Sequence, residues 1–460
     1  MIDPCKSDNE EIRNYLEMAL GIGKTDDLFS DLPKEAVSTE RTCLSTSLSE
    51  LEVRREVEKI LAKNITVKEY TSFLGGGVWP HYVPAVVDAI ASRGEFLTGY
   101  TPYQPEISQG ILQALFEYQS IICELTNMDV ANSSMYDWAS SLGEAARMAA
   151  RVSNRNQFLV PRYMSPEKKM VLKTYTEPVD IKIVEVDHNT DTGQIALEDL
   201  KTKISNQTAA VYIENPMYLG LISDTSEAIS QIVHDVGGLF VMGVDPISLG
   251  VLKPPGDFNA DIVIGEGQPL GNYLNSGGPL LGIFACRDLT PLIRQMPGRI
   301  IGMTTTKNSN DRAFCMALQT REQHIRRNRA TSNICSNEAL CAVRTAVFMS
   351  LLGSIGLKKL GENILTKTDY AIDILSEING VQTPLFKSAH FKEFTINFDR
   401  TLKSNNQINQ KLLQKGIIGG KFVGSEFTEL RQTALYCLTE LHTLSEINRL
   451  KMCIEDILEN

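Results

Sequence analysis

The sequence of 460 residues has no excess of basic residues and no long apolar run. Its 45 Lys and Arg residues stand against 56 Asp and Glu residues, which gives a formal charge of −11. Because nucleic acids are bound through clustered cations, this balance argues against a nucleic-acid partner. No apolar run comes near the ~20 residues that a bilayer span needs, so the sequence predicts no membrane partner.

The chain also lacks paired cysteines and a leader pattern. Its nine cysteines are scattered between Cys5 and Cys453 without a C-x-x-C pair, which is typical neither of a disulfide framework nor of a zinc site. The first 23 residues carry acids where a signal peptide would have a basic and then an apolar region. We therefore expect a cytoplasmic protein with reduced thiols.

Patterns for several kinds of site are missing as well. The six histidines show no metal-ligand spacing, and no cluster of His, Cys or carboxylate residues resembles a zinc or calcium site. A Walker motif and a G-x-S-x-G elbow are absent, and the glycines of residues 265–271 do not form the G-x-G-x-x-G of a dinucleotide site. The sequence predicts no metal site.

Hydrophobic periodicity divides the chain into three regions. Apolar residues three and four apart predict helices in an N-terminal helical arm, residues 1–69. In residues 70–330, β-branched runs alternate with helical segments, which predicts a large α/β domain around a mostly parallel sheet. The expected strands of that sheet are 179–187, 209–215, 238–245, 260–266 and 279–285.

The last region, residues 331–460, has a different pattern. Helical spacing recurs over long stretches, and two short β-rich runs lie between them. We expect a smaller C-terminal α+β domain, with helices at 336–353, 360–378 and 444–460 and strands at 391–398 and 433–440.

A stiff polar loop stands out at residues 100–106. Two prolines fix φ within it, and several neighbouring side chains can form hydrogen bonds. Its candidate binding residues are Tyr100, Thr101, Tyr103, Gln104 and Glu106. Composition leaves two interpretations open, a binding loop and a rigid connection to a helix that starts near Ser108.

Two further candidates lie at expected element ends. Ser140 precedes a predicted helix, where a small hydroxyl residue favours an N-cap and, as an alternative, a phosphate site at the helix dipole. Asp245 ends an apolar strand at the carboxyl edge of the sheet, where α/β proteins place ligands. A carboxylate there can pair with a protonated ring nitrogen of a cofactor or cap the next turn.

Four segments carry a resemblance to a known family: residues 73–77, 100–110, 129–137 and 265–271. They resemble the P-protein of the glycine cleavage system, glycine dehydrogenase (decarboxylating), and most closely the first subunit of its two-subunit form. The resemblance implies a fold-type I architecture of the pyridoxal-phosphate (PLP)-dependent transferases, with a large α/β domain and a smaller α+β domain. It also implies the reaction in which glycine loses CO2 and its aminomethyl group passes to the lipoyl group of H-protein.

The sequence departs from that family at the cofactor site. Gln268, eleven residues before Pro279, stands where the family has its Schiff-base lysine, and an amide cannot form a Schiff base. Trp138 stands in a turn where first-subunit members have glycine and would crowd a phosphate. The resemblance therefore implies a pseudo-site at Ser140, Asp245 and Gln268, with no catalytic residue and no bound cofactor in this chain.

The resemblance also implies a division of labour between subunits. PLP would be bound by a homologous, lysine-bearing second subunit in a heterotetramer with two copies of each chain. We expect Tyr100, Thr101, Tyr103, Gln104 and Glu106 to complete the active site of that partner. Two alternatives stay open: a self-sufficient PLP enzyme that uses another lysine, and a non-catalytic regulatory relative.

Overall fold

The computed structural model describes residues 10–36, 47–67, 69–278, 280–334 and 338–459. The chain divides into two units, Met1–Ile65 and Thr66–Asn460. Because the second unit is compact throughout, the expected division into two domains at residue 330 stays a prediction.

The first unit contains the helices that periodicity predicts for the arm. Its elements are α1 (Glu10–Leu20), the short 3-10 helices η1 (Thr25–Phe29) and η2 (Lys34–Ala36), and α2 (Glu50–Leu61). Helix α2 begins with a capping box, in which Ser49 Oγ accepts from the Glu52 N–H and the Glu52 carboxylate accepts from the Ser49 N–H. No residue of α2 is buried.

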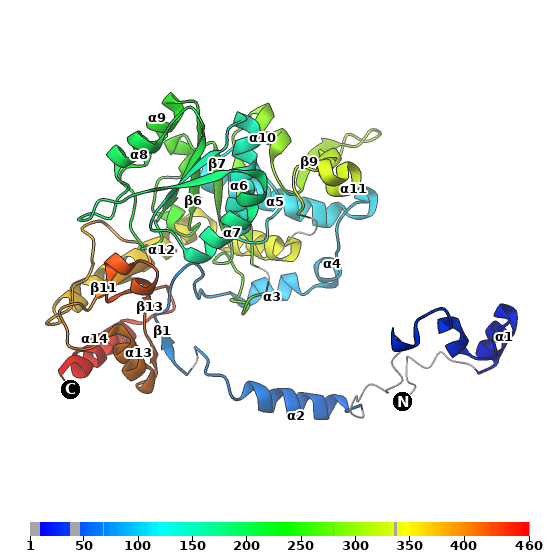
Figure 1. The fold of residues 1–460 in the computed structure, drawn as a ribbon, viewed down its shortest axis with the longest axis horizontal. Coiled ribbons are helices and arrows are strands. Elements are labelled where there is room, and N and C mark those ends of the chain that lie inside the picture. The colour runs from blue at the N-terminus through cyan, green and yellow to red at the C-terminus, as the bar shows by residue number, and fades with distance from the viewer. Residues whose placement is uncertain (1–9, 37–46, 68, 279, 335–337, 460) are drawn as a thin grey trace. The chain divides into compact units, whose positions relative to one another are not determined.

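A seven-stranded, mostly parallel sheet forms the centre of the second unit (Figure 1). Its strand order is β2-β8-β7-β6-β5-β3-β4, and only β8 and β2 pair antiparallel with their neighbours. The strands are β2 (Val130–Ala131), β3 (Gln157–Pro161), β4 (Lys182–Val186), β5 (Thr208–Asn215), β6 (Leu239–Val244), β7 (Ile262–Glu266) and β8 (Gly282–Cys286). The five expected strands are all present, whereas β2 and β3 were not expected. Strand β2 has only 2 residues and gives no periodic signal, and β3 ends at Pro161, a residue that argues against a central strand.

Helices cover both faces of this sheet. Successive residues of β5 alternate between two buried cores: Val211 packs with one and Tyr212 with the other. Helices α5 (Gln109–Thr126), α8 (Leu197–Lys203) and α9 (Ser226–Asp235) contribute to the first core, and α6 (Trp138–Ser153), α7 (Pro166–Thr176) and α10 (Thr290–Gln295) to the second. Two-sided burial explains why these strands are almost continuously apolar.

The C-terminal part forms a second, antiparallel sheet with helices packed on it. Its strand order is β11-β14-β13, with β11 (Glu393–Asn397), β14 (Thr433–Cys437) and β13 (Lys421–Phe422). Helices α13 (Asn405–Gln414) and α14 (Leu444–Glu459) pack there, and β1 (Thr71–Ser72) pairs in parallel with β12 (Ile417–Ile418).

One long helix, α12 (Ala339–Ser376), replaces the two helices expected at 336–353 and 360–378. Gly353 interrupts it with φ 58° and ψ −175°, so the chain bends where the two expected helices would separate. Residues 336 and 337 lie outside the described residues. By length and composition α12 could cross a membrane, a test that buried core helices also pass, and its Ala342 and Phe348 are buried in hydrophobic cores.

The sequence did not predict the antiparallel hairpin β9 (Ile300–Thr305) and β10 (Arg312–Ala317). It follows α10, packs on α5 and forms a two-stranded sheet of its own, and its Ile301 and Phe314 join a core that the seven-stranded sheet shares. The helices α3 (Ala85–Ala91) and α4 (Gly94–Leu97) precede the polar loop, which enters α5 through η3 (Pro105–Ile107).

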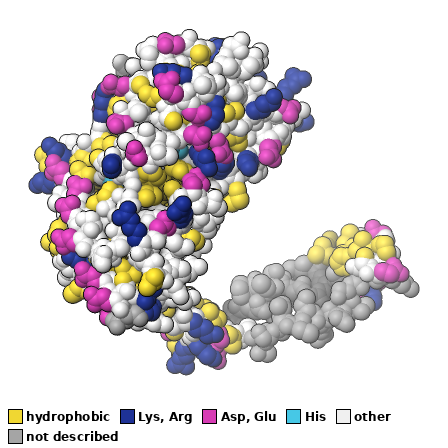
Figure 2. All heavy atoms as spheres, turned by 60° about the vertical axis from the view of Figure 1, so that its left-hand side comes forward, with side chains coloured by type: hydrophobic (Ala, Val, Ile, Leu, Met, Phe, Trp, Pro, Cys, Tyr) yellow, Lys and Arg dark blue, Asp and Glu magenta, His cyan; other side chains and the backbone are white. Residues whose placement is uncertain are grey.

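The surface carries both signs of charge. On the face shown in Figure 2, basic and acidic side chains are interspersed, and hydrophobic side chains gather near its centre. The basic side chains form no continuous stripe on this face, in keeping with the formal charge of −11.

Candidate functional site

The candidate site lies at the carboxyl edge of the central sheet, where β6 and β7 end side by side. Asp245 follows β6, and Gln268 follows β7 after one intervening residue. Helix α6 begins at the same edge, because the N–H of Trp138 donates to Glu266 Oε2 over 3.2 Å. Ligands of open α/β sheets bind at this kind of edge.

Two carboxylates of the chain itself occupy the N-terminus of α6. Asp137 is the N-cap: its Oδ1 accepts from the Ser140 N–H at 2.6 Å, and Ser140 Oγ accepts from the Asp137 N–H at 3.1 Å. Glu266 accepts from the N–H of Trp138, so the Trp138 and Ser140 N–H groups, which could bind a phosphate, both have partners within the chain. Ser140 is not the N-cap that the sequence favoured, because α6 begins at Trp138 and Ser140 lies in its first turn.

Glu266 is buried, and burial raises its pKa to about 8. The N–H groups of Gln268 and Leu281 each donate to its Oε1 over 3.0 Å and oppose that rise, whereas the charge of Asp137 adds to it. A phosphate at the start of α6 would therefore have to displace the carboxyl group of Glu266 and lie beside the carboxylate of Asp137, which the local electrostatics disfavour.

The indole of Trp138 lies against the sheet beside Asp245. A Cβ on Gly243 would be 2.8 Å from Trp138 Cζ2, so the glycine leaves the room that the ring fills. Asp245 directly follows β6 and is two residues from Gly243, so both positions face the same side of the sheet. The indole Nε1 donates to Tyr212 Oη over 3.0 Å, which fixes its orientation.

A buried ion pair continues from this ring. Lys168 Nζ lies 3.6 Å from the centre of the Trp138 ring and 2.5 Å from Glu214 Oε1. Tyr212 also donates its hydroxyl to Glu214 Oε1 over 2.8 Å. Both charged partners are buried, so each satisfies the other and neither is left as an isolated charge.

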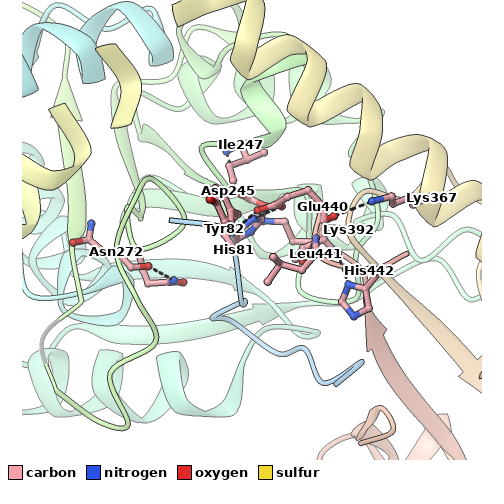
Figure 3. Close-up of polar contacts among 12 residues, drawn as sticks. His81, Tyr82, Asp245, Ile247, Asn272, Lys367, Lys392, Glu440, Leu441 and His442 are labelled. Atoms are coloured by element: carbon pink, nitrogen blue, oxygen red, sulfur yellow. Dashed lines mark hydrogen bonds and ion pairs between the residues drawn. The ribbon is translucent and has the colours of Figure 1, made fainter. Parts of the chain in front are cut away.

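Asp245 has a second buried lysine as its partner, as Figure 3 shows. Lys392 Nζ lies 2.5 Å from Asp245 Oδ2, and the side chains are 1% and 5% exposed. Asp245 Oδ1 also accepts from the Ile247 N–H at 3.1 Å, the turn-capping role that the sequence left open. The carboxylate that could pair with a cofactor ring nitrogen is therefore already neutralised within the chain.

Other buried groups surround Lys392. His81 lies beside the pair, and its Nδ1 lies 2.8 Å from Glu440 Oε2 (Figure 3). Burial lowers the pKa of His81, and the charge of Lys392 lowers it further.

Gly75 and Gly76, in the segment 73–77, lie against the carboxyl group of Glu393. The Gly76 N–H donates to Glu393 Oε1 over 2.6 Å, and a Cβ on Gly75 would be 2.2 Å from that oxygen. Only a glycine allows this approach. Burial raises the pKa of Glu393 to about 7.

These side chains leave almost no space. The cavity among Trp138, Lys168, Asp245 and Lys392 has a volume of about 20 Å³, which is room for one water molecule and not for a pyridine ring. Gln268 does not line this cavity. Its Nε2 donates instead to the Asn272 carbonyl over 2.8 Å. The residues present do not fit PLP.

The polar loop lies outside this cavity. Tyr100 is 80% exposed, Gln104 and Glu106 are exposed, and Thr101 is half-buried. Tyr103 is partly exposed, and its hydroxyl is 3.0 Å from Arg299 Nη2. None of these loop residues lines the cavity at Asp245, so the structure does not bring the loop together with that site.

Sequence reasoning missed four of the residues that fill the site: Lys168, Glu214, Glu266 and Lys392. Each lone charge resembles a surface residue in the sequence, and its partner is distant, 46 residues away for Lys168 and Glu214. The one available signal was position, since Glu214 and Glu266 end or nearly end buried strands.

Metal and thiol chemistry find little support in the described part of the chain. Among those residues no group of three or more His, Cys, Asp or Glu residues could hold a metal ion. The described cysteines are free, and Cys5, Cys43 and Cys335 lie outside the described residues.

Lys253, which like Asp245 belongs to the segment between β6 and β7, lies at the surface. Its Nζ pairs there with Glu227 Oε1 at 2.8 Å.

Sequence comparison identifies the family. The family model described as "Glycine cleavage system P-protein" matches residues 4–453. The chain belongs to the glycine cleavage system P-protein family. A relative from Staphylothermus marinus, described as "Probable glycine dehydrogenase (decarboxylating) subunit 1", is 52% identical over 97% of this chain and 96% of its own length. A relative of the same description from Thermococcus onnurineus is 51% identical over 94% of each chain.

Solved structures agree with this P-protein assignment. A crystal structure of glycine decarboxylase (P-protein) in inhibitor-bound form matches with a TM-score of 0.89 and 36% identity, over 99% of this chain and 100% of that one. A sphingosine-1-phosphate lyase from Burkholderia pseudomallei matches with a TM-score of 0.67 at 12% identity, over 92% and 94%, and shows the fold alone. The expected fold-type I α/β class is confirmed.

Breaking the pair of Asp245 and Lys392 should destabilise the protein. Because Lys392→Met leaves a buried carboxylate without its partner, we expect the free energy of unfolding to fall by about 3–5 kcal/mol in urea titrations. Lys253→Met, in the exposed pair with Glu227, is the matched control and should change it by less than ~1 kcal/mol. Equal effects of the two substitutions would contradict a role for the buried pair.

Stability should also depend on pH through Glu266. The folded protein keeps this proton up to about pH 8, whereas an unfolded glutamate releases it near pH 4.5. The contribution of this proton to the free energy of unfolding is therefore fully present below pH 4.5 and is lost as the pH rises through 8. The free energy of unfolding falls by at most ~1.4 kcal/mol per pH unit over this range. We expect Glu266→Gln to flatten the stability profile between pH 5 and 8.5, measured by urea unfolding. The exposed Glu227→Gln control should keep the wild-type slope, and a Glu266→Gln profile parallel to the wild type would refute the prediction.

Proposed function

We propose that this chain is the non-catalytic first subunit of a two-subunit P-protein, and that it acts with a homologous, lysine-bearing second subunit. The observation that carries the proposal is the filled carboxyl edge of the sheet. Gln268 supplies no amine, and a cavity of about 20 Å³ leaves no room for PLP. The relatives' description as subunit 1 of glycine dehydrogenase (decarboxylating) supports a partner subunit.

In this proposal the complex decarboxylates glycine and transfers the aminomethyl group to the lipoyl group of H-protein. PLP and the Schiff-base lysine belong to the partner, and two copies of each chain form a cytoplasmic heterotetramer. The contribution of this chain is the loop with Tyr100, Thr101, Tyr103, Gln104 and Glu106, offered to the partner's active site. The exposure of this loop, away from the filled pseudo-site, supports that role.

An apolar hollow close to the loop supports a protein partner. It lies between α3, α4, α5 and α12, and its lining includes Val86, Ile90, Phe96, Val347 and Leu351. Val86 and Leu351 are exposed in this chain. Exposed apolar groups of this kind are typical of surfaces that another chain covers, and we propose the lysine-bearing subunit as that chain.

A self-sufficient PLP enzyme that uses another lysine is disfavoured. The buried lysines beside Asp245 are Lys168 and Lys392, and each already forms an ion pair with a buried carboxylate. A regulatory relative without a role in catalysis has no specific observation in its favour, although only reconstitution separates it from the proposed subunit.

Reconstitution tests the proposed function. Glycine-dependent exchange of labelled CO2, with H-protein present, should occur only when this chain is mixed with a lysine-bearing homologous subunit. PLP absorbance should follow the partner, and each chain alone is the control. Activity or aldimine absorbance from this chain alone would establish the self-sufficient alternative, and no gain on mixing would favour the regulatory one.

A substitution in the loop tests how this chain contributes. Gln104→Ala removes an exposed amide without disturbing the core, so turnover of the mixed complex should fall while the two subunits still co-elute in gel filtration. Gln410→Ala, which removes an exposed amide from α13, is the matched control and should leave turnover unchanged. Unchanged kinetics of Gln104→Ala would remove this residue from the proposed role.

A further inference from the structure

The polar loop has an anchored side and an exposed side. Tyr103 turns its hydroxyl toward Arg299 and Glu322, which belong to the segments on either side of the β9–β10 hairpin. Tyr100 and Ile107 are 80% and 77% exposed. No sequence pattern distinguishes Tyr103 from Tyr100, whereas in the structure Tyr103 is anchored and Tyr100 is exposed.

The anchor of Tyr103 is a largely buried charged pair. Arg299 Nη2 donates to the Tyr103 hydroxyl over 3.0 Å, and that hydroxyl donates to Glu322 Oε2 over 3.4 Å. Arg299 Nε lies 3.5 Å from the same carboxylate oxygen, and the side chains of Arg299 and Glu322 are 7% and 16% exposed. The ring of His324 meets the Tyr103 ring edge-on, with centroids 5.5 Å apart. Three groups thus restrict a side chain that connects the loop to the protein body.

Two glutamines of α5 hold the hairpin that supports this anchor. The Gln109 amide donates to the Phe314 carbonyl and accepts from the Phe314 N–H, each over 2.9 Å, and it also donates to the Pro105 carbonyl over 2.6 Å. The Gln119 amide pairs in the same way with Ile301, over 3.0 and 2.8 Å. Gln109 therefore connects the loop and β10, and the hairpin is attached to α5 at one point on each strand.

We infer that Arg299 and Glu322 are positioning residues for the proposed reaction. They hold Tyr103, and through it they present the exposed side of residues 100–107 to the partner's active site in one fixed position. A displacement of about 1 Å at a reacting centre can reduce a rate by ~100-fold, so fixing such a loop within its own subunit matters for turnover. This inference rests on the proposed function.

Two measurements test this inference, and Arg299→Gln is common to both. Hydrogen exchange of the isolated full-length chain should show amide exchange in residues 101–108 that is ~5–10-fold faster in Tyr103→Phe and Arg299→Gln, the loss of one or two hydrogen bonds. Arg312→Gln, at an exposed position of the same hairpin, is the matched control and should leave that exchange unchanged. In the mixed complex, Arg299→Gln and Glu322→Gln should lower kcat by about 10-fold, with partner PLP absorbance and co-elution as in the wild type.

The pattern across variants separates positioning from general destabilisation. Arg299→Lys should restore part of kcat, and the Tyr103→Phe, Arg299→Gln double variant should lose little more than the worse single variant, because one network is broken once. Unchanged loop exchange, or faster exchange with wild-type kcat, would overturn the inference. A wild-type mixture without activity would overturn the proposed function and the positioning role together. The exchange rates of residues 101–108 in the isolated chain would still show whether Arg299 and Tyr103 hold the loop.

Discussion

The compensation of buried charge at the carboxyl edge of the sheet is the constraint on which this structure depends. Two carboxylates there, Asp245 and Glu214, face two buried lysines, Lys392 and Lys168. Two further carboxyl groups, Glu266 and Glu393, have no lysine at ion-pair distance. Burial raises the pKa of Glu266 to about 8 and that of Glu393 to about 7. The site is therefore close to neutral without any ligand. A dianionic phosphate would upset this balance, since no free cation in the described site would compensate it.

Shape and charge act together in this filling. Trp138 occupies the sheet surface over Gly243, and Glu266 takes the backbone donor at the start of α6 that would otherwise point at a ligand. Lys392 directly precedes β11, and Asp245 directly follows β6. Their ion pair therefore joins the C-terminal part of the chain to the central sheet. The interior of the site thus contributes to holding the fold together. The fold itself matches the inhibitor-bound P-protein with a TM-score of 0.89.

The surface and the interior of the chain serve different ends. The interior is satisfied by its own side chains, whereas the loop at 100–106 and the neighbouring apolar hollow are left exposed. Tyr103 links the exposed loop to the interior, because its hydroxyl accepts a hydrogen bond from the largely buried Arg299.

Local sequence determined much of this protein. Alternation of apolar runs and helical spacing predicted the five main strands and the parallel sheet. It placed the start of α6 too late, because the N-cap is Asp137 and not Ser140. The resemblance to the P-protein family, and no local pattern, drew attention to Gln268. Periodicity acts over a few residues, so it could not reveal β3, the β9–β10 hairpin or the single bent helix α12.

Tertiary structure alone decided which side chains fill the candidate site and which residues anchor the loop. Asp245 and Lys392 are far apart in the chain, as are Tyr103 and Arg299, whose contact spans 196 residues. A lone lysine or glutamate has no local pattern that distinguishes a buried partner from a solvated surface residue, because its pairing depends on which strand ends the fold places side by side.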